Sequence, residues 1–157
     1  MVRGLLLITV CAALLMAGCQ TPSIPVDIGR FTGTRMSEEE KVALVLEDVR
    51  NGMENRRIYQ VLANISKNYR DREGRDYEAL RAHLNTIMGN YRSFRITRTP
   101  PRIKVQGNQA RVVESFGTSA EPANPDLHLP VNLQGQMVVL LEKNEGKWQI
   151  VEWGPLG

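Results

Sequence analysis

The stretch that decides the fold is residues 68–91, which read NYRDREGRDYEALRAHLNTIMGNY. Its first part, 69–72, is short and polar and is bounded by Gly74, which predicts a short strand followed by a turn. Asp76 then stands where a helix N-cap is expected, because its carboxylate can accept a hydrogen bond from a free backbone amide. The residues that follow predict a helix whose apolar stripe is wide enough to cover a sheet. The stripe consists of Tyr77, Leu80, Leu84, Ile87, Met88 and Tyr91.

Two amphipathic helices are predicted upstream of this stretch. The first begins at Ser37, because the Ser37 hydroxyl and the Glu40 carboxylate can form a capping box. It ends between Gly52 and Asn55, and its apolar face consists of Val42, Val45, Leu46, Val49 and Met53. The second helix is shorter, and its apolar positions are Ile58, Val61, Leu62 and Ile65. Helices joined by so short a connection are expected to fold back on each other or to bend sharply.

Strands are predicted downstream of Tyr91, because the apolar period changes there from 3.6 to 2. The first strand is interrupted by Pro100 and Pro101, and a double proline belongs at a sheet edge or a bulge. Further strand segments are expected at 103–105, 110–118, 131–143 and 148–153. Residues 137–141 are apolar on both faces, which indicates a central strand. The predicted class is α+β, with three N-terminal helical segments packed on an antiparallel sheet of about four to five strands.

The N-terminus resembles the signal peptide of a bacterial lipoprotein. Arg3 precedes an apolar run over 5–17, which is shorter than the roughly 20 residues of a membrane-spanning helix. The run ends in Leu-Met-Ala-Gly-Cys, residues 15–19, and this motif resembles the lipobox. The resemblance implies that Cys19 carries acyl chains such as palmitate, and Gln20 in place of aspartate favours the periplasmic face of the outer membrane. An ordinary secretory signal, or an uncleaved anchor with an incidental cysteine, is the alternative.

Three segments follow from this reading: a signal peptide at 1–18, a tether at 19–36 and one domain at 37–157. Cys11 leaves with the signal peptide and Cys19 is acylated, so no disulfide is expected in the domain. The 20 Lys and Arg residues against 17 Asp and Glu residues are too nearly balanced to favour nucleic acid as a partner. No sequence motif for a metal or a cofactor is present, and none is expected to bind.

The order of the predicted elements resembles the nuclear transport factor 2-like superfamily, which includes SnoaL-like proteins and ketosteroid isomerases. The resemblance covers roughly 37–153 and depends on 69–71 with Gly74, on 77–80, on 107–112 and on 146–151. It implies a cone-shaped roll in which a curved sheet wraps the helices and leaves a pocket at the open end. Members of the superfamily include isomerases, dehydratases and cyclases, and also proteins that only bind or dimerise. The isomerases use a pair of acidic residues with a tyrosine, and those residues have no match here.

Glu114 is the leading candidate for a catalytic residue. Strict alternation from Ala110 through Val112 to Phe116 places its carboxylate on an apolar face, where an unpaired charge is costly. Three alternatives remain open. Glu114 lines a pocket and acts as an acid or base with a raised pKa, it pairs with an arginine, or a bulge turns it to solvent.

Each remaining candidate site residue also has a structural alternative. Tyr69 and Tyr91 either reach the pocket with their hydroxyls or bury their rings in the core. His83 is either a pocket base or a boundary residue of its helix. His128 and Asp126 share a proline-rich loop, where two ligands would form only a weak metal site.

A basic run that surrounds the second helix is interleaved with acidic residues, so it predicts a solvated face of mixed charge. Weak contact with anionic lipid headgroups is the alternative. The run consists of Arg50, Arg56, Arg57, Lys67, Arg70, Arg72 and Arg75.

The first functional hypothesis is a lipid-anchored, periplasm-facing lipoprotein that serves as a non-catalytic binding or assembly module. Its expected partners are the membrane, reached through the lipid anchor, and a small apolar ligand or a protein. The alternative is a small pocket enzyme of the isomerase or dehydratase type that uses Glu114 with Tyr69 or His83. A third hypothesis is a homodimer formed through the outer face of the sheet.

Overall fold

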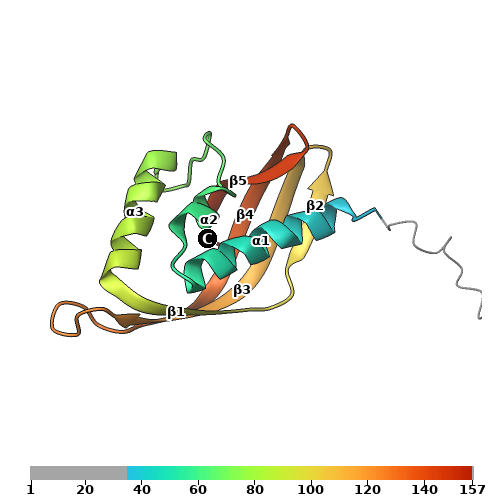
Figure 1. Cartoon of the computed structure of the whole chain (residues 1–157). Coiled ribbons are helices and arrows are strands. Elements are labelled where there is room, and N and C mark those ends of the chain that lie inside the picture. The colour runs from blue at the N-terminus through green and yellow to red at the C-terminus, as the bar shows by residue number, and fades with distance from the viewer. Residues whose placement is uncertain (1–34, 157) are drawn as a thin grey trace, which may run out of the picture. The chain divides into compact units, whose positions relative to one another are not determined.

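The computed structural model describes residues 35–156, and it shows three helices followed by an antiparallel sheet of five strands (Figure 1). The elements are α1 (Glu38–Glu54), α2 (Ile58–Leu62), α3 (Tyr77–Asn90), β1 (Tyr91–Arg98), β2 (Arg102–Gln106), β3 (Gln109–Pro122), β4 (Val131–Asn144) and β5 (Lys147–Pro155). The predicted fold class is confirmed. The predicted signal peptide, Cys19 and nearly all of the tether lie outside the described residues.

The sheet has the strand order β1-β3-β4-β5, and β2 pairs with β3 as well. β1 pairs with 116–122 of β3, whereas β2 pairs with 109–113. β1 and β2 therefore form one interrupted edge strand, and the interruption contains Pro100 and Pro101, as the double proline predicted. β4 lies between β3 and β5, which confirms that 137–141 belong to a central strand.

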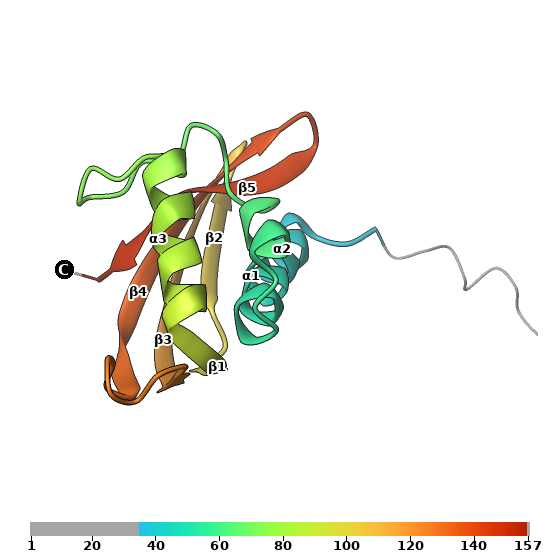
Figure 2. The same ribbon diagram turned by 60° about the vertical axis from the view of Figure 1, so that its left-hand side comes forward.

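The three helices cover one face of the sheet, here called the inner face (Figures 1 and 2). The opposite face is called the outer face. α1 contributes Val42, Leu46 and Val49 to the core. Residues that alternate along β3, β4 and β5 meet the helices from the sheet side, namely Ala110, Val112, Val139, Leu141, Trp148 and Ile150. Residues 35–157 are one compact unit, and this core lies wholly within it.

The start of α1 is held by its own cap and by the β4–β5 hairpin. The Ser37 Oγ accepts from the Glu40 amide at 3.1 Å, and the Ser37 amide donates to the Glu40 carboxylate at 2.7 Å, which confirms the capping box. Glu38 accepts hydrogen bonds from Lys143 at 2.8 Å and from the Trp148 indole at 2.7 Å. The hydrogen bond from Lys143 is the main reason that the pKa of Glu38 falls to about 2, followed by those from Lys41 and Trp148.

Residues 68–76 form a loop, and the short polar strand predicted at 69–72 is wrong. A single bridge joins Arg70 and Asp76. The Asp71 carboxylate accepts from the backbone amides of Glu73 at 3.0 Å and Arg75 at 2.9 Å. A side chain therefore binds the amides that a neighbouring strand would otherwise bind. The turn at Gly74 is confirmed by its φ of 81°, a conformation in which glycine has no steric cost.

Residues 64–70, which overlap the start of this loop, cover the free edge of β5. The amide of Ile150 donates to the carbonyl of Asn64, the amide of Ser66 donates to the carbonyl of Ile150, and the amide of Arg70 donates to the carbonyl of Val151, at 2.8 to 2.9 Å. An uncovered edge would offer unpaired amides and carbonyls to another chain. Asp76 then begins α3, because its carboxylate accepts from the Ala79 amide at 2.9 Å, which confirms the predicted N-cap.

Candidate functional site

Glu114 lies on the inner face of β3, where it is 4% exposed. The β3–β4 register runs without a shift through the pair of Glu114 and Met137. No bulge is present at this position, so the alternative that a bulge turns the carboxylate to solvent is wrong. The direction that alternation predicted for this side chain is confirmed.

Arg98, the last residue of β1, is the partner of Glu114. Its Nη2 lies 2.6 Å from the Glu114 Oε2, and its Nε donates to the same oxygen at 2.8 Å. Its Nη1 donates to the carbonyl of Leu46 on α1 at 3.0 Å. One guanidinium thus joins β1, β3 and α1. Arg98 was not among the predicted site residues, although it follows Phe94 and Ile96 at a period of two and so lies on their face.

The pKa of Glu114 is raised. Burial is the main cause, since it disfavours the charged carboxylate, and the hydrogen bonds and charge of Arg98 oppose it. The alternative that Glu114 pairs with an arginine is therefore confirmed, while its role as an acid or base stays a prediction. A carboxyl in this state is chemically able to exchange a proton.

The interior cavity that Glu114 lines is very small. The cavity has a volume of about 30 Å³, which is about the share of one water molecule in liquid water. Its walls come from α1 and from the inner face of all strands except β2, and they consist of Leu46, Val49, Arg50, Met53, Ile96, Arg98, Glu114, Met137, Val139, Ile150 and Trp153. The Trp153 indole donates to the Met137 sulfur at 3.0 Å. Ligand pockets usually measure about 300–1,000 Å³, so the interior described here is packed rather than hollow.

The structure does not bring Tyr69 or His83 to Glu114. Tyr69 is buried in the core, and its hydroxyl lies 3.3 Å from both the Asp71 carboxylate and the Trp153 carbonyl. Burial is the main cause of its raised pKa. His83 is exposed on α3, which does not fit the hypothesis of a pocket base. Within residues 35–156, no hydrogen bond or ion pair joins Glu114 to either residue.

The remaining candidates lie near the β3–β4 loop. Tyr91 is half-buried, and its ring centroid lies 6.1 Å from those of Phe94 and His128. Asp126 is exposed. In the described part of the chain, no group of three or more His, Cys, Asp or Glu side chains could hold a metal ion. No described helix has the length and apolarity needed to span a membrane.

Three cations of the basic run around α2 form ion pairs with interleaved or neighbouring carboxylates. Arg50 pairs with Glu47 and Glu54 on α1. Arg72 pairs with Glu152 at 3.0 Å, and Arg75 pairs with Asp71 at 2.7 Å.

Solved structures are similar to this chain, although neither a protein-family model nor a curated protein sequence matches it. A candidate scytalone dehydratase from Novosphingobium aromaticivorans has a TM-score of 0.67 and 14% identity, covering 74% of this chain and 80% of that chain. A candidate dehydratase of the nuclear transport factor 2-like family from Streptomyces avermitilis has a TM-score of 0.64 and 13% identity. The match covers 76% of this chain and 97% of that chain. The fold is nuclear transport factor 2-like. A nuclear transport factor 2-like superfamily protein from Salmonella enterica has a TM-score of 0.63 and 14% identity. The match covers 76% of this chain and 91% of that chain.

Two of the similar structures are named as candidate dehydratases, and another is a hexachlorocyclohexane dehydrochlorinase. Identities this low establish the fold and leave the activity open, because one fold hosts many unrelated functions.

Proposed function

We propose that this domain is a non-catalytic binding or assembly module of the cell envelope. The observation that carries the proposal is the cavity of about 30 Å³ beside Glu114, which is too small for an organic substrate. The occupation of the Glu114 carboxylate by Arg98 adds support, because an acid–base residue has to reach the substrate proton. The domain would then use its surface rather than its interior.

A pocket enzyme of the isomerase or dehydratase type is the second candidate. It is favoured by the activities named among the neighbours and by the raised pKa of Glu114. This candidate requires Met137 and Trp153, or the α1 helix, to move away and open a cavity about ten times larger.

A ligand titration separates the two candidates. Phenol is titrated into residues 35–157, and the NMR signal of the Met137 methyl group reports on the interior. We expect no saturable change in the natural sequence, whereas the Met137→Ala variant, followed through the indole signal of Trp153, should bind phenol in its enlarged cavity. Saturable binding beside Glu114 in the natural sequence would contradict the proposal and favour the enzyme.

We further propose that Cys19 carries the lipid that holds the domain at the periplasmic face of the outer membrane. The support is the lipobox motif that ends at Cys19 and the strength of two or more acyl chains as an anchor. Cys19→Ser is expected to abolish incorporation of labelled palmitate and to remove the protein from the outer-membrane fraction. Cys11→Ser is the matched control and should change neither result. Undiminished palmitate labelling of Cys19→Ser would overturn this proposal.

A further inference from the structure

Three cations occupy neighbouring positions on the outer face of β2 and β3. Lys104 lies directly opposite Arg111, and Arg102 lies opposite Val113, two residues along the same pair of strands. All three cations are exposed. The ion pairs found among residues 35–156 involve other cations. Since like charges directly opposite each other destabilise a strand pair, this cluster opposes the stability of the fold.

Protection of the sheet edge explains only part of this cluster. Charged side chains on an edge strand discourage pairing with another chain, and β2 is such an edge. Arg111, however, belongs to β3, which has β2 on one side and β4 on the other. A cation at this internal position does not protect an edge. An arrangement that destabilises the fold and has no structural role is typical of a functional site.

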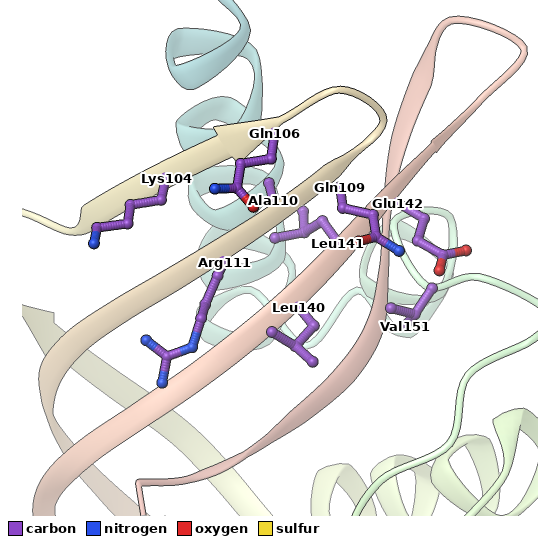
Figure 3. A pocket seen from close by; sticks show the side chains of 9 residues that line it. All are labelled: Lys104, Gln106, Gln109, Ala110, Arg111, Leu140, Leu141, Glu142 and Val151. Atoms are coloured by element: carbon purple, nitrogen blue, oxygen red, sulfur yellow. The ribbon is translucent and has the colours of Figure 1, made fainter.

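The surface is hollowed at these residues. A depression of about 260 Å³ is lined by Arg102, Lys104, Arg111 and Val113. A second depression of about 320 Å³ shares Lys104 and Arg111 with the first (Figure 3). Its lining also includes the apolar residues Ala110, Leu140, Leu141 and Val151 and the polar residues Gln106, Gln109 and Glu142. Figure 3 shows Lys104, Arg111 and Leu140 projecting from three adjacent strands. Because Lys104 and Arg111 line both depressions, cationic and apolar groups line two adjoining hollows.

The chemistry of these hollows selects a ligand class. Two guanidinium forks and an ammonium match the oxygens and the charge of a phosphate group. Leu140 and Val151 are half-buried, so an apolar chain lying over them would remove further apolar surface from water. Glu142 would repel a second anionic group. These features together fit one anionic headgroup that is attached to an apolar chain.

We propose that the outer face binds a single anionic amphiphile, with its phosphate headgroup on Arg102, Lys104 and Arg111 and its apolar chain on Leu140 and Val151. This inference rests on the proposed function of a binding module, for which it names the ligand class. The hollow shape favours one amphiphile molecule over the flat surface of a bilayer.

The test is calorimetric titration of residues 35–157 with monododecyl phosphate below its micelle concentration. We expect saturable binding with one ligand per chain. Arg111→Gln should weaken it about tenfold or more, because a charge-assisted contact to the phosphate is lost. Arg95→Gln is the matched control, since Arg95 is exposed on β1 and lines neither depression. Without ligand, the melting temperature of Arg111→Gln should equal or exceed that of the natural sequence, because a pair of like charges is removed. A cooperative melt also shows that the variant folds.

Other ligands and variants identify the result that would overturn the proposal. If inorganic phosphate binds as tightly as the amphiphile, Leu140 and Val151 do not bind an apolar chain. The same conclusion follows if Leu140→Asn binds the amphiphile with unchanged affinity. Binding only to vesicles of phosphatidylcholine and phosphatidylglycerol would indicate a membrane surface. Equal weakening by Arg95→Gln and Arg111→Gln would indicate net charge alone. If Met137→Ala changes amphiphile affinity and Arg111→Gln does not, the ligand enters the interior and the proposed function also fails. Absence of any binding rejects the ligand class alone.

Discussion

Replacement of Arg98 by methionine is expected to lower the free energy of unfolding by about 3–5 kcal/mol, because it leaves a buried carboxylate without its partner. Glu114 is 4% exposed and receives both of its contacts from Arg98. The variant also loses the hydrogen bond from Arg98 to the carbonyl of Leu46, which joins the sheet to α1. Urea denaturation followed by circular dichroism measures the change.

Two further variants identify the cause of this loss. The double variant Arg98→Met/Glu114→Met should recover most of the stability, because an apolar pair of similar volume needs no charge partner. Arg95→Met removes an exposed cation from the same strand and should change stability by no more than about 0.5 kcal/mol. A double variant as unstable as Arg98→Met would show that the loss comes from packing rather than from the uncompensated charge.

The Arg98→Met defect should also depend on pH. The pKa of Glu114 is already raised, which means that the folded protein binds this proton more tightly than the unfolded chain does. Stability conferred through such a carboxyl increases as pH falls. Without Arg98 the pKa rises further, so the defect should be largest at neutral pH and shrink toward and below the ordinary glutamate pKa of about 4.3.

Replacement of Asp71 by alanine is expected to cost about 2–3 kcal/mol, because the donors that bind this buried carboxylate lose their acceptor. The Asp71 carboxylate accepts from the amides of Glu73 and Arg75, from the Arg75 guanidinium at 2.7 Å and from the Tyr69 hydroxyl at 3.3 Å. These contacts hold the loop that covers β5 and leads into α3. Thermal and urea unfolding measure the loss.

Matched variants test the role assigned to Asp71. Glu73→Ala removes an exposed carboxylate from the same loop and should leave the free energy of unfolding nearly unchanged. Asp71→Asn keeps one acceptor oxygen for the amides and loses the charge, so its stability should be intermediate. An Asp71→Ala variant as stable as the natural sequence would mean that the loop is held by its backbone contacts with β5 alone.

The pH dependence of stability tests the contribution of Asp71 independently. Burial alone would raise the pKa of Asp71, but the hydrogen bonds from the Arg75 side chain and backbone hold it below its usual range. The stabilisation is therefore fully present above the ordinary aspartate pKa of about 3.9 and is lost as pH falls through the lower pKa of the folded state. The acid side of the stability curve should be flatter in Asp71→Ala.

The features that could be predicted from the sequence depend on neighbours along the chain. The caps at Ser37 and Asp76 join residues three positions apart, and both are observed. The inward direction of Glu114 follows from the period of its own strand. Helix and strand order followed from the same local patterns, so the fold class was predictable without tertiary information.

Two of the features that could not be predicted depend on residues far apart in the chain, and a third depends on a side chain that binds amides in its own loop. Arg98 and Glu114 are 16 positions apart and meet only because β1 pairs with β3 at one register. Residues 69–72 were assigned to a strand because their polarity does not reveal that the Asp71 side chain binds the local amides. The size of the interior cavity depends on how Met137 and Trp153 pack together, and no pattern along the chain encodes that volume.

The contacts of 64–70 with β5 determine when the domain can fold during its synthesis. Ile150 bonds with Asn64 and Ser66, and Tyr69 meets the carbonyl of Trp153, so the first half of the domain completes its contacts only with the last strand. Synthesis begins at the N-terminus, and the core therefore cannot close before nearly all of the chain has been made. Such a topology leaves the helices of the nascent domain without their sheet partners until translation is nearly complete.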